Sequence, residues 1–290
     1  MDEQKQCCYP VSVDITIAPS ELNVSTSAAT YPLHHEIDRA PQGPALALLH
    51  PLGADLGFWA ACRRLWAGRR TVLAYDRPGA GGSPPPPAPQ SAAACVADLE
   101  ALRAQLGLEM IVPVGVAIGA MLAAAYAASH PERVAGLVLC NPATALSPAG
   151  REMTVGRVQR LRAHGIDGLL PDAVDRAFNG LPQDGCYQAY LAAFRRNDPL
   201  GYERCALAAM EIDITEDLRR IRCPTLVVAG SLDILFPPGE ALKTVALLAD
   251  ATYVELPKAA HFPPFQSPQA FVDAVDAFLP RCRHEIGSAA

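Results

Sequence analysis

Short, uninterrupted apolar runs alternate with helical segments along most of this chain, and this alternation restricts the fold more than any other feature. The apolar runs lie at residues 45–49, 71–75, 110–114, 134–140, 224–230 and 252–256. A strand that is apolar at nearly every position must be covered on both faces, as in a parallel sheet between two layers of helices. The sequence therefore predicts an α/β fold with a mostly parallel central sheet and helices on both of its faces.

The alternation is interrupted once, at about residues 144–210, where the pattern is helical and rich in arginine. Because the apolar runs resume afterwards, we interpret this stretch as an insertion into one sheet domain. The predicted parts are an N-terminal extension at residues 1–30, a core at residues 31–143 and 211–282, and a helical cap at residues 144–210. Within the extension, residues 11–17 are compatible with an edge strand.

Charge and composition exclude several classes of function. The net charge is −6 and there is no block of Lys and Arg, so we expect no nucleic-acid partner. The chain has neither a signal peptide nor an unbroken apolar run of about 18 residues, so we expect no membrane partner. The nine cysteines form no C-x-x-C pair and no zinc spacing. They indicate reduced thiols in a cytoplasmic protein without a metal.

A candidate catalytic turn lies at residues 115–119, Gly-Val-Ala-Ile-Gly, between the apolar run at 110–114 and a helical segment at 117–130. It has the outline of G-x-S-x-G, in which glycines relieve a sharp strand-to-helix turn that presents a nucleophile. The central residue is Ala117, whose methyl group cannot attack a carbonyl. The backbone N–H of Ile118 would begin the helix and could face a developing oxyanion. Taken alone, the pentapeptide favours a helix start with two packing glycines.

An acid and a base follow this turn in the expected order. Asp233 comes after the apolar run at 224–230, and His261 comes after the run at 252–256. Asp233 would orient the imidazole of His261, which would act as general base and then as general acid. A second oxyanion donor is expected after the first long apolar run, where we choose the backbone N–H of Leu52. Asp233 and His261, each at the end of a strand, make the turn around Ala117 a nucleophile elbow.

Other residues near these positions have more ordinary interpretations. Trp59 and Phe262 are candidates for apolar walls of a substrate cavity, with core packing as the alternative. His50 is expected to support the loop that follows its strand, and residues 76–83 to form a structural turn. Cys140 lies near the elbow, but a buried apolar thiol explains it better than a nucleophile does.

Several stretches of the chain resemble the α/β-hydrolase superfamily, and within it most closely the 3-oxoadipate enol-lactonases. The stretches are LALLHPLGADLGFW, VLAYDRPGAGGSPPP, VGVAIGAMLAAAYAASHPERVAGLVLCNPA, RNDPLGYERCALAAMEIDITEDLRRIRCPTLVVAGSLDILFPP and VELPKAAHF. The resemblance covers about residues 33–280. It implies an α/β-hydrolase fold with a helical cap, and hydrolysis of a small carboxylated lactone or ester in aromatic catabolism.

By this resemblance Asp233 and His261 match the acid and the base, and Leu52 and Ile118 match the oxyanion donors. Ala117 stands where the family has serine. No cofactor or metal is implied, and the partner is a small-molecule substrate bound by a monomer or a homodimer. An anionic substrate would need an arginine of the cap. The candidates are Arg151, Arg157, Arg160, Arg162, Arg176, Arg195 and Arg196.

Three hypotheses account for the alanine. In the first, the chain is an ester or lactone hydrolase whose serine was replaced, by engineering or by natural loss. In the second, His261 and Asp233 act as a dyad without a covalent intermediate, in a lyase, an isomerase or an enzyme that uses direct water attack. In the third, the protein binds a small ligand without turnover. Whether Ala117 is native is the fact that would separate them best.

Overall fold

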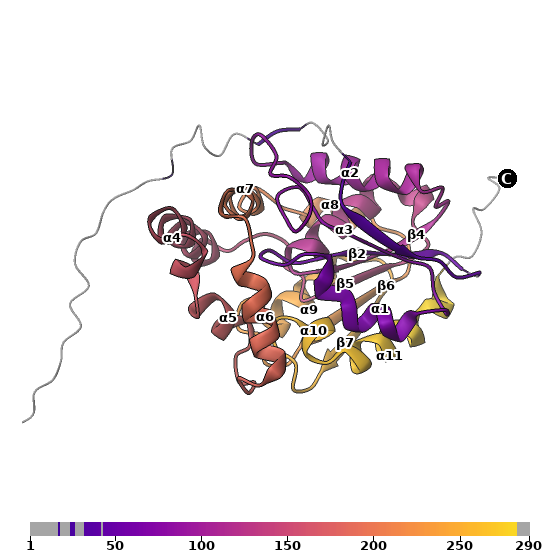
Figure 1. The fold of residues 1–290 in the computed structure, drawn as a ribbon. Helices are drawn as coiled ribbons and strands as arrows, with labels where there is room; N and C mark the ends of the chain where they lie inside the picture. The colour runs from indigo at the N-terminus through magenta and orange to yellow at the C-terminus, as the bar shows by residue number, and fades with distance from the viewer. Residues whose placement is uncertain (1–16, 18–23, 27–31, 42, 283–290) are drawn as a thin grey trace, which may run out of the picture.

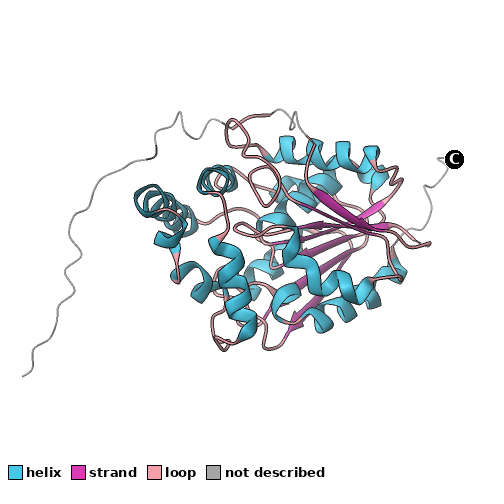
Figure 2. Ribbon diagram, in the orientation of Figure 1, coloured by secondary structure: helices cyan, strands magenta, loops and turns pink. Residues whose placement is uncertain are grey.

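The computed structural model describes residues 17, 24–26, 32–41 and 43–282 of the 290-residue chain (Figure 1). The predicted extension at residues 1–30 and its edge strand therefore lie almost entirely outside the described residues. The rest of the chain forms a central sheet, two covering layers of helices and a separate group of helices beside the sheet (Figure 2).

The sheet has seven strands in the order β1-β3-β2-β4-β5-β6-β7. Its strands are β1 (His35–Asp38), β2 (Ala45–Leu49), β3 (Val72–Tyr75), β4 (Ile111–Val116), β5 (Leu137–Cys140), β6 (Thr225–Gly230) and β7 (Ala251–Leu256). Only β1 runs antiparallel to its neighbour, and every other strand pair is parallel. The mostly parallel sheet predicted from the apolar runs is confirmed.

Helices cover both faces of the sheet, which explains the uninterrupted apolar strands. Leu46 and Leu48 of β2 belong to one core cluster, whereas Ala47 and Leu49 belong to the other. Helices α2, α3 and α8 lie on one side of the sheet and α1, α10 and α11 on the other (Figure 1), and α9 packs beside α8. The covering helices are α1 (Ala60–Trp66), α2 (Ala92–Gln105), α3 (Ile118–Ser129), α8 (Thr215–Arg220), α9 (Pro238–Leu247), α10 (Pro263–Gln266) and α11 (Pro268–Phe278).

Short 3₁₀ turns join several of these elements. They are η2 (Leu56–Trp59), η3 (Pro131–Arg133), η4 (Ile166–Leu169) and η5 (Leu279–Arg281). Side-chain caps begin the predicted helices after β2 and β3. The carboxylate of Asp55 accepts a hydrogen bond from the backbone N–H of Gly57 at 2.8 Å, and the hydroxyl of Ser91 accepts one from Ala94 at 3.2 Å. Such caps satisfy N–H groups that the first turn of a helix leaves free.

Four helices lie within the stretch predicted as a helical cap. They are α4 (Pro148–His164), α5 (Asp172–Ala177), α6 (Gly185–Arg195) and α7 (Pro199–Ala209). Figure 1 shows them grouped beside the sheet. We keep the name cap for these four helices and the loops between them.

Among the contacts that join the cap to the core, two involve the loops after β2 and β3. The side-chain amide of Asn197 donates a hydrogen bond to the carbonyl of Gly53 at 3.0 Å. In the second contact, the backbones of Gly79 and Gly201 touch, so that a Cβ on Gly201 would lie 2.0 Å from the carbonyl oxygen of Gly79. No side chain fits there without moving the backbone, and position 201 therefore requires glycine.

Gly201→Ala is expected to destabilise the protein by about 1–3 kcal/mol, because the added methyl group must push helix α7 away from the core. Chemical denaturation of the purified variant measures the change. The matched control is Gly156→Ala on α4, where an added Cβ meets nothing within 4 Å. The control should be neutral or stabilising by up to about 1 kcal/mol, since alanine favours a helix. Equal stability of the two variants would contradict the close contact.

Candidate active site

The turn between β4 and α3 has an unusual backbone at its centre. Ala117 has φ 52° and ψ −115°, and its N–H donates a hydrogen bond to the carbonyl of Cys140 at 2.9 Å. A Cβ on Gly115 would lie 2.2 Å from the carbonyl oxygen of Gly119, and one on Gly119 would lie 2.3 Å from that of Leu49. A non-glycine residue with positive φ costs about 1–3 kcal/mol and persists only where its surroundings impose it. The turn is therefore sharp, glycine-dependent and strained at Ala117.

The predicted acid and base lie in contact. His261 Nδ1 and Asp233 Oδ2 are 2.8 Å apart, and both side chains are almost fully buried. Asp233 follows β6 and His261 follows β7, which are neighbouring parallel strands, so their carboxyl ends bring the two residues together. The other carboxylate oxygen of Asp233 accepts backbone hydrogen bonds from Leu235 at 2.8 Å and Phe236 at 3.1 Å. These donors fix the carboxylate so that Oδ2 faces the imidazole.

Asn141 is a second support of this pair, which the sequence analysis missed. Its side-chain amide donates hydrogen bonds to the carbonyls of Ala260 at 2.9 Å and His261 at 3.0 Å, and its oxygen accepts one from the N–H of Gly230 at 2.8 Å. Asn141 thereby ties the end of β6 to the loop that carries His261. It directly follows the apolar run of β5. The acid and the base were predicted because they follow such runs, and the same criterion would have identified Asn141.

Gln266 holds the same loop from α10. Its carbonyl oxygen accepts hydrogen bonds from the N–H groups of Ala260 at 2.8 Å and Phe262 at 3.2 Å. Its amide nitrogen donates to the carbonyl of Ala177 at 2.9 Å, and the N–H of His261 donates to that same carbonyl at 3.1 Å. Because Ala177 belongs to α5, the cap helps to position the imidazole.

The two predicted oxyanion donors lie beside Ala117. Leu52, Ala117 and Ile118 all line one cavity. Ile118 is the first residue of α3, and the first four N–H groups of an α-helix have no acceptor within the helix. Leu52 follows β2, which pairs with β4. Residues from two loops, after β2 and after β4, therefore line the cavity together with Ala117.

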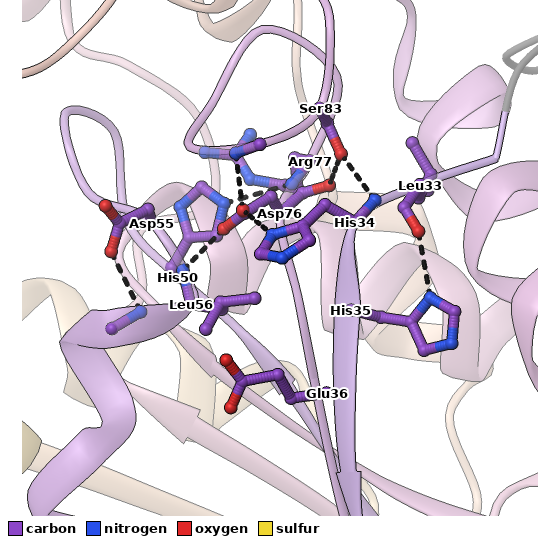
Figure 3. Close-up of polar contacts among 12 residues, drawn as sticks. Leu33, His34, His35, Glu36, His50, Asp55, Leu56, Asp76, Arg77 and Ser83 are labelled. Atoms are coloured by element: carbon purple, nitrogen blue, oxygen red, sulfur yellow. Dashed lines mark hydrogen bonds and ion pairs between the residues drawn. The ribbon is translucent and has the colours of Figure 1, made fainter.

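His50 supports the loop that carries Leu52, as predicted. The N–H of Arg77 donates a hydrogen bond to His50 Nε2 at 3.1 Å (Figure 3). The ring proton is therefore on Nδ1, which donates to the carbonyl of Pro51 at 2.9 Å. Burial lowers the pKa of His50 well below its ordinary value, and the positive charge of Arg77 lowers it further. The neutral imidazole is thus a structural link between the loops after β2 and β3.

The stability of the protein is expected to fall as the pH drops below about 6.5, the ordinary pKa of histidine. Because the pKa of His50 is lower in the folded state, the unfolded chain binds more protons in this range, and unfolding becomes easier with acid. One such group contributes a slope of up to about 1.4 kcal/mol per pH unit. Denaturation of the parent chain and of His50→Gln between pH 7 and 5 measures this slope. The variant should have the smaller slope, and equal slopes would refute the assignment.

Residues 76–83 form a structural turn, as predicted (Figure 3). The buried carboxylate of Asp76 accepts backbone hydrogen bonds from Leu56 at 2.6 Å and Gly82 at 2.8 Å, and contacts His34 Nδ1 at 2.6 Å. The hydroxyl of Ser83 is buried and donates to the carbonyl of Asp76 at 2.8 Å. Ser83 therefore closes the turn and is not a nucleophile.

The cavity over the elbow has a volume of about 820 Å³, part of which is open to solvent. One wall comes from the core loops and includes Leu52, Ala117, Ile118, His261 and Phe262. The other wall comes from the cap and includes Thr154, Arg157, Tyr190, Phe194 and Tyr202. Sites for small ligands commonly have similar, mainly apolar walls with a few polar groups. The predicted base His261, the residues of the two predicted oxyanion donors and Phe262 all line this cavity. The predicted acid Asp233 does not line it and contacts the imidazole of His261.

The prediction that Trp59 is a wall of this cavity is wrong. Its side chain is completely buried and does not line the cavity. It packs against Phe58 and Phe271, with ring centroids 5.2 Å and 6.1 Å away. Trp59 directly precedes α1, which packs against α11. Its ring therefore belongs to the helical layer that covers the sheet.

Cys140 is a buried core thiol, as the ordinary interpretation held. It lies in the cluster that contains the other strand residues on its face of the sheet. Burial raises the pKa of Cys140 well above its ordinary value, and the nearby charge of Asp233 raises it further. A nucleophilic cysteine must be a thiolate. Cys140 is therefore unsuited to replace the missing hydroxyl.

The cap arginines differ in their partners. Arg157 lines the cavity, and of the seven candidates it alone does so. Four others form ion pairs with acidic side chains. The pairs are Arg151–Glu211, Arg160–Asp172, Arg162–Glu203 and Arg195–Asp167.

Three further findings concern the described residues only. No group of three or more His, Cys, Asp or Glu side chains there could hold a metal ion. The seven described cysteines are free thiols. In the same part of the chain, no helix combines the length and the apolar character needed to cross a membrane.

Similarity to known proteins extends over most of the chain. The model of one protein family, described as alpha/beta hydrolase fold, matches residues 44–268. The 3-oxoadipate enol-lactonase 2 of Acinetobacter baylyi is 26% identical over 263 residues, which cover 90% of this chain and 96% of the relative. The pimeloyl-[acyl-carrier protein] methyl ester esterase of Chromobacterium violaceum is 31% identical over 256 residues, with 84% and 97% covered. The crystal structure of the enol-lactonase from Burkholderia xenovorans LB400 has a TM-score of 0.80 and 28% identity, and covers 86% of this chain and 96% of that one.

Proposed function

We propose a function on the premise that the chain belongs to the alpha/beta hydrolase fold family, whose match includes the elbow, the acid and the base. The cavity binds a small lactone or carboxylic ester and places its carbonyl carbon over position 117. The strained backbone of Ala117 carries this proposal. A positive φ at a non-glycine residue lifts its side chain into the cavity at a cost in folding free energy. That cost is understandable if the position presents a nucleophile.

The residues around Ala117 have complementary roles in this proposal. The N–H groups of Ile118 and Leu52 stabilise the oxyanion that forms when the carbonyl is attacked. Asp233 accepts a hydrogen bond from the Nδ1–H of His261, which leaves Nε2 free to act as a base. With serine at position 117, His261 would take the hydroxyl proton while the serine oxygen bonds to the carbonyl carbon, and it would return the proton to the alcohol as the ester bond breaks. A water molecule, deprotonated by His261, would then attack the acyl group and release the acid, and the serine oxygen would regain the proton.

The chain as sequenced has no hydroxyl at position 117, and a water molecule is the remaining nucleophile. His261 would take a proton from this water, whose oxygen bonds to the carbonyl carbon. Collapse of the tetrahedral intermediate would then release the alcohol, which receives the proton from His261. The hydrogen bonds that hold Asp233 and the His261 loop favour this second candidate, because they keep the dyad arranged without serine.

One assay tests these alternatives. The chain, Ala117→Ser and His261→Ala are incubated with activated esters and with enol-lactones. Turnover gained by Ala117→Ser supports a hydrolase whose nucleophile was replaced, and turnover of the original chain that is lost in His261→Ala supports the dyad. If none of the three proteins turns over any of these substrates while an added ester still raises the melting temperature, the hydrolase proposal fails in favour of a binding protein.

A cytoplasmic setting is part of the proposal. The seven described cysteines are free thiols, and thiols stay reduced mainly inside the cell. The likeness to enol-lactonases favours the breakdown of aromatic compounds as the process that supplies the substrate. Fractionation of the native cells and growth on aromatic carbon sources would test the two statements separately.

A further inference from the structure

A second cavity lies beside the first, between α3 of the core and α7 of the cap. Its volume is about 350 Å³, part of which is open to solvent. Most of its wall is apolar and includes Leu122 of α3 and Cys205 of α7. The polar residues of the wall are Arg77, Gln90 and Arg204. The mechanism proposed above gives this cavity no role.

Two side chains separate the two cavities. Ile118 and Ala209 line both of them, and no other described residue does. Ile118 is the first residue of α3 and Ala209 is the last residue of α7, and both are buried. The partition therefore lies where the core meets the cap. Because Ala209 contributes a methyl group and Ile118 a branched butyl group, Ile118 forms the larger part of it.

The surface of α3 continues from the first cavity into the second. Leu122 lies one turn after Ile118 and lines the second cavity only. Residues one turn apart lie on the same face of a helix. The side chain of Ile118 therefore stands at the boundary between the elbow and the second cavity. Shortening this side chain would join the two cavities along α3.

The proposed mechanism decides which part of an ester faces the partition. His261 returns a proton to the leaving alcohol, so the alcohol must lie beside the imidazole. His261 lines the first cavity only. The acyl group is attached on the other side of the carbonyl carbon, and the carbonyl oxygen is directed to the N–H of Ile118. The acyl group is therefore the part that extends toward the side chain of Ile118.

We propose that Ile118 is a specificity-determining residue, whose side chain closes the catalytic cavity toward the second one and restricts the substrate to esters with a short acyl group. This inference rests on the proposed function, because it names the substrate class of the same cavity. The backbone N–H of Ile118 stabilises the oxyanion, whereas its side chain limits the length of the acyl group. A substitution at this position keeps the N–H, so the role of the side chain can be tested by itself.

Two esters of different acyl length test the partition in the Ala117→Ser background. Ala117→Ser should have a higher kcat/KM for p-nitrophenyl butyrate than for p-nitrophenyl octanoate. Adding Ile118→Ala should raise the ratio of octanoate to butyrate by about tenfold or more, because each methylene group removed from water contributes about fourfold in affinity. The ratio is the readout, since a change in folding or in the oxyanion site affects both esters.

Leu122→Ala in the same background is the matched control. It shortens a side chain of similar size on the same helix and enlarges the second cavity, but it leaves the partition in place. Both variants create space in the core and should lower the melting temperature. Only Ile118→Ala should change the ratio. The milder Ile118→Val should shift it in the same direction by a smaller factor, and it replaces Ile118→Ala in both tests if that variant does not fold.

Calorimetric titration with methyl butyrate and methyl octanoate reports on the partition without the serine. Relative to the butyrate, Ile118→Ala should bind the octanoate about tenfold or more tighter than the chain as sequenced does. Turnover with an unchanged ratio, or an equal change in Leu122→Ala, would overturn the partition and leave the proposed function standing. Absence of turnover in every chain would overturn the hydrolase, and the relative affinities would then decide on the partition alone.

Discussion

Ala117→Ser should raise kcat/KM for an activated ester by about 10³- to 10⁶-fold. Loss of a triad nucleophile costs about 10⁶ in turnover in comparable enzymes, and oxyanion donors and substrate binding retain about 10³–10⁴ over water. Restoring the hydroxyl should therefore recover most of that loss, provided that the remaining parts are in place. His261, Asp233 and the elbow backbone already have the required arrangement. Initial rates with p-nitrophenyl butyrate measure the gain.

Ala117→Gly is the matched control for this gain of activity. Glycine also lacks a nucleophile, but it adopts the φ of 52° without strain. Ala117→Gly should therefore have the same turnover as the parent chain and be more stable by up to about 1 kcal/mol. An increase in turnover in both variants would point to a looser elbow as the cause. No increase in Ala117→Ser would refute position 117 as the nucleophile site.

In the Ala117→Ser background, His261→Ala should lower kcat by about 10⁴-fold or more, and Asp233→Asn by a similar factor. Without the imidazole no group takes the serine proton, and without the carboxylate the imidazole holds its proton on the wrong nitrogen. Single-turnover and steady-state rates with the same ester measure both losses. The double change should cost little more than either single change, because the pair acts as a unit.

A second histidine–aspartate pair supplies the control for these losses. His34 Nδ1 lies 2.6 Å from Asp76 Oδ2, a contact like the one between His261 and Asp233, but neither residue lines the cavity. His34→Ala should change stability and leave kcat near that of Ala117→Ser. Equal losses in His34→Ala and His261→Ala would mean that both act through folding, and the general base would then be unassigned.

The sheet could be predicted because each strand is recognisable from its own short stretch of sequence. Each parallel strand buries both faces, so its sequence is an uninterrupted apolar run. For example, β2 begins and ends at the predicted residues. Helices α8 and α10 were missed for the opposite reason. They have six and four residues, which is too short for a periodic pattern. In α8 a single buried residue, Leu218, holds the helix against the core.

Of the site residues, the sequence could predict only those in the loops that follow the strands of the sheet. Asp233 lies in the loop after β6 and His261 in the loop after β7, so chain order alone indicates that they meet. The orientation of a side chain on a cap helix has no such signal. Arg157 faces the cavity while Arg151, on the same helix, pairs with Glu211, and the sequence pattern of the helix does not distinguish them. Trp59 was misplaced in the same way, because its ring direction depends on how α1 packs on α11.

The contact between Gly79 and Gly201 has a consequence for redesign of the protein and for its evolution. The cap and the core meet there backbone to backbone, with no side chain between them that could adapt to a new neighbour. Exchanging the whole cap for that of a relative would disturb this fit. Changes at single positions on the inner faces of α4, α6 and α7 leave it untouched. New substrate preferences should therefore arise in this chain by point substitution of the cavity wall more readily than by transplanting the cap as a module.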